Sequence, residues 1–457
     1  MSIQSINPVN GQVVRIYPED SEQQIRDKIE NAQRAWVGWR GSSFEERAAP
    51  LRKTAGLLRN RAEELASLMA VEMGKPVKDG RGEIEKCALA CEYYAANGEN
   101  FLKDEKVATD ASTSYVSFQP LGIVLAVMPW NFPFWQVFRF LAPGLLAGNC
   151  GLLKHASNVP GCALAIEQVL KDAEFPPGVF QTLMIGSKAV KQVIEHHLVK
   201  AVTLTGSTEA GKQVAQQAAL QLKKTVLELG GSDPYIVLED ADLDLAAEIC
   251  AQSRLINNGQ SCIAAKRFIV VESIEKKFTE LFIEKMASRT TGDPFDAKTN
   301  LGPMARIDLR DELHKQVLDN VEAGAKLILG GKLPEKHEEN AFYEPTILAG
   351  VKKGMPAYSE EIFGPVASII SAGNPEDAIK IANDNPFGLG AAVFTKDIEF
   401  GEAIARNRLE AGLCFVNSFV KSDPRLPFGG INQSGYGREL SMFGIREFVN
   451  IKTVFVK

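Results

Sequence analysis

Residues 201–212 have the sequence AVTLTGSTEAGK, which passes within a few residues from an apolar strand into a helix. Ala201–Leu204 is a short apolar run typical of buried strands, and a helical pattern follows over residues 208–222. Further strands are expected at Ile123–Val127, Gly151–Leu153, Phe180–Ile185, Val226–Leu229 and Tyr235–Leu238. Apolar strands that alternate with helices predict an α/β fold with a parallel sheet covered on both faces. Ligands of such sheets bind at the carboxyl ends of the strands.

The alternation of strands and helices starts again after residue 262. Strands are expected at Phe268–Val271, Lys326–Leu329, Val366–Ile370, Ala391–Phe394 and Leu413–Val416, and helices near 274–288, 307–323, 376–384 and 399–408. This half predicts a second α/β domain, whereas residues 22–98 read as helices alone. Cys262 falls near the start of the second domain, and ligand clefts favour such domain boundaries.

Two half-polar strands far apart in the sequence predict a separate small β unit. Residues 112–119 alternate polar and apolar side chains, and so does the C-terminal run 448–455. If these runs pair, they can build a projecting arm used in self-association. The alternative is an ordinary surface hairpin.

Composition narrows the classes of function. A chain of 457 residues is too long for one compact core, so two or three domains are expected. The net charge of −6 gives no general affinity for nucleic acid or anionic membranes. The first residues lack the pattern of a secretory signal, and no apolar stretch reaches the length of a membrane span. The seven scattered cysteines have no metal-ligand spacing, so we expect a reducing, cytoplasmic compartment and no bound metal.

The sequence NNGQSC at residues 257–262 follows a helix expected over about 241–256. Two asparagines and a glycine at a helix end indicate a sharp turn of the backbone. A thiol on such a turn can project into a cleft and act as a nucleophile once deprotonated. The alternative is that Cys262 is simply buried, as free cysteines often are.

Polar side chains also stand at the ends of three expected strands. In MPWNFP (128–133) two prolines would hold the Asn131 amide rigidly, as an oxyanion donor requires, unless the motif is only an aromatic-rich turn. Glu228, between two leucines and before two glycines, could have a raised pKa and act as a base; the alternative is an exposed carboxylate. Lys154 could contact a ribose or phosphate, or be solvated at the surface.

The stretch TGSTEAGK (205–212) opens a helix with backbone N–H groups suited to a phosphate. It also nearly matches the phosphate loop of nucleotide hydrolases, which provides an alternative function. Gln213 stands where that loop needs a hydroxyl for magnesium, and Glu209 would bring negative charge to the phosphates. The dinucleotide pattern G-x-G-x-x-G is absent, so cofactor binding is inferred from topology and this helix start.

Together these motifs resemble those of the NAD(P)-dependent aldehyde dehydrogenase superfamily. The similar stretches, in the family's order, are MPWNFP (128–133), LLKHAS (152–157), TGSTEAG (205–211), ELGG (228–231), GQSC (259–262), EEIFGPV (360–366) and LPFGG…SGYGRE (426–439). The resemblance implies a Rossmann-like cofactor domain over 1–106 and 120–228 and an α/β catalytic domain over 229–430. It also implies a bridging or oligomerisation arm over 107–119 and 443–457, which favours the arm over the hairpin, and a homodimer or homotetramer.

The resemblance also implies a role for each matching residue. Cys262 would attack the aldehyde to give a thiohemiacetal, Asn131 and the Cys262 N–H would hold the oxyanion, and Glu228 would activate water to hydrolyse the thioester. Glu439 resembles a second acid in the proton path. The residues that resemble cofactor contacts are Trp130, Lys154, Ser157, Thr205, Gly206, Ser207, Glu361 and Phe363.

One departure from the family bears on the cofactor. Members that prefer NAD usually carry a glutamate three residues after the ribose-binding lysine, and this chain has Ser157 there. Without that carboxylate nothing repels a 2′-phosphate, which Lys154 and the Ser157 hydroxyl could bind. We therefore predict NADP as the preferred cofactor, with NAD possible.

Two further residues resemble substrate contacts of succinate-semialdehyde dehydrogenases. Arg139 lies within an aromatic run where such enzymes hold the substrate's carboxylate, and Ser422 resembles a second carboxylate contact. Arg139 could instead pack its stem against aromatic rings. Ile256 replaces a further arginine of some members, and Ala264 replaces the second cysteine of redox-regulated ones. On the basis of Arg139 and Ser422, succinate semialdehyde is the expected substrate, and Ile256 is evidence against it. A broad aliphatic or aromatic aldehyde dehydrogenase is the alternative. An acylating enzyme that uses coenzyme A fits Glu228 less well.

Overall fold

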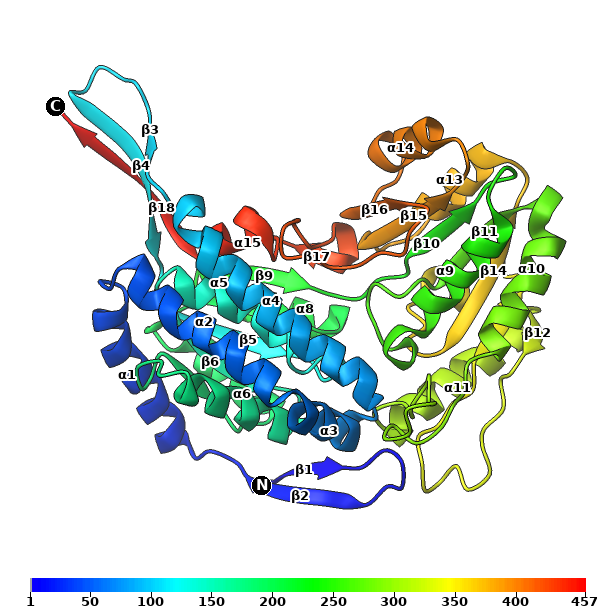
Figure 1. The fold of residues 1–457 in the computed structure, drawn as a ribbon, viewed down its shortest axis with the longest axis horizontal. Helices are drawn as coiled ribbons and strands as arrows, with labels where there is room; N and C mark the ends of the chain where they lie inside the picture. Colours follow the sequence, from blue (N-terminus) through cyan, green and yellow to red (C-terminus); the bar gives the residue numbers. More distant parts are fainter. Residues whose placement is uncertain (1) are drawn as a thin grey trace.

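The structure is a computed structural model that describes residues 2–457. Two large sheets, each with its own helices, lie side by side, and a narrow β arm that carries the C-terminus projects from the first (Figure 1). A hairpin of β1 (Ser2–Ile6) and β2 (Val13–Pro18) lies at the N-terminus. Within residues 2–457 no helix combines the length and the apolar character needed to cross a membrane.

The first sheet has six strands in the order β17-β9-β8-β5-β6-β7. These are β5 (Ile123–Met128), β6 (Cys150–His155), β7 (Phe180–Thr182), β8 (Val199–Thr205), β9 (Lys224–Glu228) and β17 (Gly435–Tyr436). All pairs are parallel except that of β17 with β9. The chain moves outward from β5 in both directions, so the topological switch point lies between β5 and β8, where α/β sheets bind ligands.

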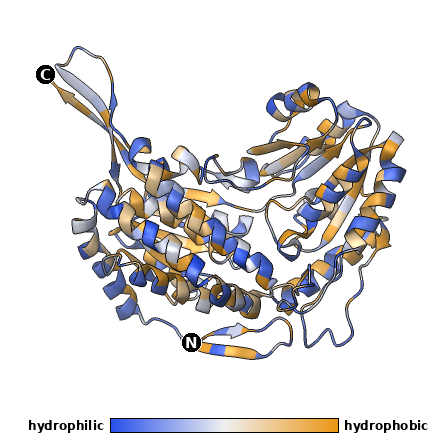
Figure 2. Ribbon diagram, viewed as in Figure 1, coloured by the Kyte–Doolittle hydropathy of each residue, from blue (hydrophilic) through white to orange (hydrophobic). Residues whose placement is uncertain are grey.

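Helices cover this sheet. They are α1 (Glu22–Trp39), α2 (Phe44–Asn60), α3 (Ala62–Met73), α4 (Val77–Phe101), α5 (Trp135–Leu146), α6 (Pro160–Asp172), α7 (Val190–Glu195) and α8 (Thr208–Leu220). Consecutive residues of β5 and β8 are buried, which confirms that both faces of the sheet are covered. Figure 2 shows the corresponding distribution, with apolar residues concentrated on the strands and mixed polarity on the outer helices.

The second sheet has seven strands in the order β12-β13-β14-β11-β10-β15-β16. They are β10 (Pro234–Val237), β11 (Arg267–Val271), β12 (Lys326–Leu329), β13 (Thr346–Ala349), β14 (Val366–Ala372), β15 (Gly390–Phe394) and β16 (Leu413–Val416). Only β12 runs antiparallel to its neighbour. Its helices are α9 (Leu243–Leu255), α10 (Glu272–Ala287), α11 (Ile307–Glu322), α12 (Pro356–Ser359), α13 (Pro375–Asn383) and α14 (Ile398–Asn407).

Three details differ from the sequence-based expectation. The strand expected at Tyr235–Leu238 does not end the first sheet, because β10 pairs with β11 and β15 at the centre of the second. Strand β13 was not expected, although Pro345 and Gly350 flank its four residues as turn signals. After the second sheet the chain returns to the first through β17, which pairs with β9 at Glu228 and lies outside the ranges 229–430 and 443–457.

The expected pairing of the two half-polar strands is confirmed. β4 (Thr113–Pro120) pairs antiparallel with β18 (Val449–Val456) along its whole length, and β3 (Glu105–Lys106) pairs with the other edge of β4. Helix α15 (Ser441–Glu447) leads into β18. β18 is an edge strand and exposes the apolar side chains of Ile451 and Phe455. An exposed apolar edge of this kind is suited to pairing with another chain.

Candidate active site

The turn before Cys262 has an unusual backbone. Asn257, Asn258 and Gly259 have φ values of 54°, 58° and 75°, so three successive residues occupy the left-handed region. A Cβ on Gly259 would collide with the backbone of Gly364, so only glycine fits there. Asn258 ties the turn down, because its Nδ2 donates to the carbonyls of Gly74 (3.1 Å) and Pro303 (2.9 Å). The sharp turn expected from the sequence is confirmed.

The thiol that follows this turn is half-buried. Lys266 was not predicted as a site residue. Its Nζ donates to the carbonyls of Cys262 (2.6 Å) and Ser261 (2.9 Å) and so holds the backbone of both residues in place. Burial raises the pKa of the Cys262 thiol to about 12, with Arg139 and Lys266 acting in the opposite direction. The thiol is therefore protonated at neutral pH in the free protein.

Asn131 lies directly against the nucleophile turn. Its Nδ2 donates to the carbonyl of Gln260 (3.1 Å), and Asn257 Nδ2 donates to the Asn131 carbonyl (2.7 Å). An amide nitrogen has two hydrogens, so one remains for an oxyanion near Cys262. The His155 ring holds the loop of Asn131 from below: Nδ1 accepts from the Ala156 N–H (2.9 Å), so Nε2 carries the proton and donates to the Pro133 carbonyl (2.8 Å).

A buried ion pair, which could not be predicted from the sequence, supports the same loop from α4. Glu83 Oε1 accepts from the N–H groups of Phe134 (2.8 Å) and Trp135 (2.9 Å) at the start of α5. The other oxygen of Glu83 pairs with Lys75, whose Nζ lies 4.0 Å from the centre of the Phe132 ring. Carboxylates are favourable at helix N-termini. The only signal at Lys75 was the helix break at Gly74-Lys75-Pro76, which said nothing about a partner.

Two carboxyl groups face each other beside the end of β9. Glu228 and Glu439 are 2% and 4% exposed. The Glu228 oxygens have no hydrogen-bond partner within residues 2–457, and Glu439 has an ion pair with Arg139. Burial, followed by repulsion from Glu439, raises the pKa of Glu228 well above its ordinary value. A Cβ on Gly429 would lie 2.6 Å from Glu228 Oε1, so glycine leaves room beside the carboxyl. Glu228 is thus not an exposed strand-end carboxylate, and it has the environment of a buried base.

Arg139 pairs with one member of this acid pair. It is 2% exposed, its Nε lies 2.7 Å from Glu439, and its Nη2 donates to Thr205 Oγ1 (3.4 Å). Its guanidinium also lies over the Phe428 ring at 4.5 Å. Arg139 therefore packs on an aromatic ring, as the alternative expected, but it does so in the interior and not at the surface. Ser422 lies at the N-terminal end of α5, where its Oγ accepts from Trp135 Nε1 (3.1 Å).

The N-terminus of α8 offers fewer free N–H groups than expected. The Gly206 N–H donates to the Glu228 carbonyl (3.0 Å) and is not available to a ligand. Ser207 caps the helix, accepting from the Ala210 N–H (3.3 Å). The N–H groups of the first turn remain without intrahelical acceptors and can bind an anion. Gly211 and Lys212 lie inside the helix and not in a loop, so the phosphate-loop alternative is ruled out.

The other predicted cofactor residues surround the same strand ends. Lys154, at the end of β6, is half-buried and forms no ion pair with residues 2–457, and burial lowers its pKa. Ser157 is exposed three residues further on. Trp130 and Phe363 face each other edge to face with ring centres 5.8 Å apart.

Glu361 is held in place by two neighbours. It accepts from the Gly231 N–H (3.0 Å) and lies 3.4 Å from Lys266. A dinucleotide needs an anion site, a partner for its ribose and flat walls for its rings, and the α8 N-terminus, the unpaired Lys154 and the two aromatic rings supply these features. The residues present therefore fit a nicotinamide dinucleotide.

Comparison with known proteins places this site in a family. Residues 1–454 match the model of the aldehyde dehydrogenase family. The chain is 49% identical over 456 residues to a probable NADP⁺ succinate-semialdehyde dehydrogenase of a Synechocystis species, and the match covers 100% of each chain. It is 47% identical to an NAD(P)⁺ succinate semialdehyde dehydrogenase of Escherichia coli, covering 99% of this chain and 97% of that one.

The solved structure of succinic semialdehyde dehydrogenase from Streptococcus pyogenes with NADP⁺ superposes with a TM-score of 0.97. The two are 38% identical, and the match covers 99% of each chain. The full-length family match and these relatives agree with the geometry of the nucleophile turn and its surroundings. The chain belongs to the aldehyde dehydrogenase family.

Proposed function

We propose that this enzyme oxidises succinate semialdehyde to succinate with NADP as the preferred cofactor. The observation that carries the proposal is the convergence of the Cys262 turn, the Asn131 amide and the buried Glu228 carboxyl beside an internal arginine, Arg139. Relatives that match the whole chain at 47–49% identity are named for this substrate.

The chain's own groups account for the two halves of the reaction. The Cys262 thiolate adds to the aldehyde carbon, and the Asn131 amide with the Cys262 N–H stabilises the oxyanion of the thiohemiacetal. When bound, NADP would accept the hydride that the thiohemiacetal carbon loses as it becomes a thioester. Glu228 then takes a proton from water, whose oxygen attacks the thioester carbon. The C–S bond breaks to release the carboxylic acid, and the proton passes from Glu228 to the departing Cys262 thiolate, which restores the thiol.

The preference for NADP is supported by the end of β6. Lys154 has no carboxylate partner within residues 2–457, and Ser157 places a hydroxyl where a glutamate would repel a 2′-phosphate. The N–H groups of α8 would hold the pyrophosphate, and Trp130 and Phe363 would enclose the nicotinamide part of the cofactor. The carboxylate of Glu361 would accept from a ribose hydroxyl.

We also propose a homodimer or homotetramer joined through the arm of β3, β4 and β18. The exposed apolar edge of β18 supports this, because such an edge is otherwise prone to aggregation. All seven cysteines are free thiols, which suits the cytoplasm.

A panel of aldehydes assayed with NADP and with NAD tests the proposal. Succinate semialdehyde with NADP should give the highest kcat/KM, and butanal, which has the same chain length without the carboxylate, should be much poorer. If butanal and benzaldehyde are equally good substrates, the enzyme is the broad-specificity alternative. If NAD gives the higher kcat/KM, the interpretation of Ser157 is wrong.

A further inference from the structure

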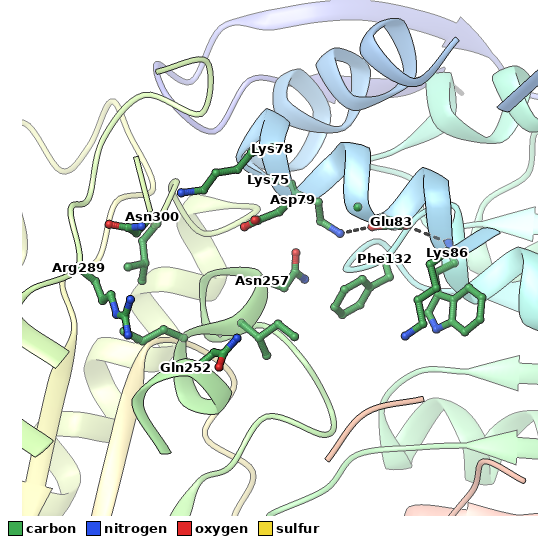
Figure 3. A pocket seen from close by; sticks show the side chains of 15 residues that line it. Lys75, Lys78, Asp79, Glu83, Lys86, Phe132, Gln252, Asn257, Arg289 and Asn300 are labelled. Carbon is green, nitrogen blue, oxygen red and sulfur yellow. Dashed lines mark hydrogen bonds and ion pairs between the residues drawn. The ribbon is translucent and has the colours of Figure 1, made fainter. Parts of the chain in front are cut away.

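A cavity of 480 Å³ opens next to the nucleophile turn (Figure 3). Phe132 and Asn257 line it, and these residues adjoin Asn131 in sequence or by hydrogen bond. The cavity therefore lies beside the residues that adjoin Asn131, although Asn131 and Cys262 are not part of its lining. Lys86 on α4 lies on one side of it, and Ile256 is part of the same lining.

The ammonium of Lys86 is held by one polar and one aromatic neighbour. Its Nζ donates to Ser422 Oγ (2.7 Å) and lies 4.5 Å from the centre of the Trp135 ring. Trp135 Nε1 donates to the same oxygen (3.1 Å), so the Ser422 hydroxyl hydrogen is left to donate elsewhere. Lys86 keeps two of its three N–H donors, so it can donate to an acceptor in the cavity that it lines. Ser422 is not part of the cavity lining, but its hydroxyl lies 2.7 Å from Lys86 Nζ and can donate to an acceptor that reaches this ammonium.

Lys86 has no ion-pair partner within residues 2–457, although two carboxylates lie close in the sequence or the fold. Glu83, one helical turn away, is engaged by Lys75 and by two backbone N–H groups. Asp423 is paired with Arg425 at 2.6 Å. A half-buried cation without a counter-charge is costly unless an anion joins it.

The arginine beside the nucleophile is in a different situation. Arg139 is paired with Glu439 at 2.7 Å, and both side chains are buried. That pair is close to neutral as a unit, so it offers an incoming carboxylate little net attraction. Lys86 supplies the positive charge that the pair of Arg139 and Glu439 lacks.

We propose that Lys86, with the Ser422 hydroxyl, binds the carboxylate at the far end of the aldehyde substrate and thereby selects an anionic aldehyde. This inference rests on the proposed function, and it assigns substrate selection to α4 as well as to α5. Arg139 then holds Glu439 and the nucleophile region in place and contributes a weaker attraction.

The charge on Lys86 should depend on pH within the working range. Burial, followed by repulsion from Arg139 on α5, lowers the pKa of Lys86 to about 8. Cys87 and Glu83 on α4 and Asp423 in the loop after β16 act in the opposite direction. The ammonium form is present below this pKa, so attraction for a carboxylate is present at pH 7 and is lost above pH 8.

The test compares Lys86→Met and Lys86→Arg with succinate semialdehyde and with butanal. Lys86→Met should lower kcat/KM for succinate semialdehyde by about tenfold or more, mostly through KM, because a charge-assisted hydrogen bond is lost. Butanal should change less than about twofold, since uncharged substrates make no such contact. Lys86→Arg should restore binding and remove the rise in KM above pH 8, because arginine stays protonated.

Lys78→Met is the matched control, because Lys78 lines the same cavity but is exposed. It should leave kcat/KM for both substrates nearly unchanged. An equal loss of kcat/KM for succinate semialdehyde in Lys78→Met would show that any positive charge near the cavity has the same effect, and it would overturn a specific contact at Lys86. If Lys86→Met keeps the wild-type preference for succinate semialdehyde over butanal, the inference is wrong while the proposed function stands. If the wild-type enzyme shows no such preference, the proposed function itself fails.

Discussion

The left-handed turn that presents Cys262 should be costly to disturb at Asn258. This side chain donates to the carbonyls of Gly74 and Pro303, and its Oδ1 accepts from the Gly302 N–H (2.8 Å). It thus joins the nucleophile turn to the end of α3 and to a loop of the second half of the chain. Its φ of 58° is tolerated by asparagine and glycine but disfavoured for alanine.

Two substitutions separate the hydrogen bonds from the backbone. Asn258→Gly removes three buried hydrogen bonds at about 1 kcal/mol each, so the free energy of unfolding should fall by about 3 kcal/mol. Asn258→Ala loses the same bonds and adds about 1 kcal/mol for a Cβ in the left-handed region. Both should also lower kcat, because a displaced nucleophile meets the aldehyde less often in a reactive orientation.

Urea unfolding of both variants, compared at equal slope, measures these differences. Asn432 is the matched control: it has a φ of 57°, is exposed, and makes no side-chain hydrogen bond to residues 2–457. At that position glycine should cost little, and only the backbone difference of about 1 kcal/mol between alanine and glycine should appear. The reasoning is refuted if Asn258→Gly is as stable as the wild type, or if alanine and glycine at 258 are equally stable.

Four further outcomes are expected. The rate of alkylation of Cys262 by iodoacetamide in the cofactor-free enzyme should rise about tenfold per pH unit from pH 7 to 10, because the thiol pKa is about 12 and only the thiolate reacts. A rate that reaches a plateau near pH 8 would contradict this. Glu228→Gln should abolish hydrolysis of the thioester. It should also raise Tm at pH 9 and not at pH 4, because a carboxyl whose pKa is raised in the folded state makes the fold less stable as the pH rises. Equal shifts of Tm at both pH values would be inconsistent with a buried charge at Glu228. Ser157→Glu should reverse the kcat/KM preference from NADP to NAD, and an unchanged ratio would remove Ser157 from the cofactor site. Arg139→Ala should raise KM for succinate semialdehyde more than for butanal, and equal effects would limit Arg139 to a structural role.

Much of the fold could be predicted because both sheets consist of buried strands. Parallel strands covered on both faces read as continuous apolar runs, which is why β5, β8, β11 and β14 lie close to their expected ranges. The same property hides which sheet a strand joins. β10 follows β9 by only a few residues, and nothing in its four apolar residues shows that it pairs with β11 and β15.

The candidate site divides in a similar way. Cys262, Asn131 and Glu228 could be singled out because each stands at a turn or strand end with glycine or proline beside it. Lys86 could not, because its significance depends on Ser422, a residue 336 positions away in the chain. The pairing of Arg139 with Glu439 is equally invisible in sequence, so the sequence could not show that this arginine has a buried counter-charge.

In the proposed reaction Cys262 carries the acyl group of succinate semialdehyde. Mass spectrometry of Glu228→Gln, mixed with NADP and succinate semialdehyde, tests this most directly, because the thioester should form and fail to hydrolyse. We predict that one succinyl group is found on the peptide that contains Cys262, and that it is absent when NADP is omitted. A succinyl group on another cysteine, or none on the protein while NADPH still forms, would contradict the account.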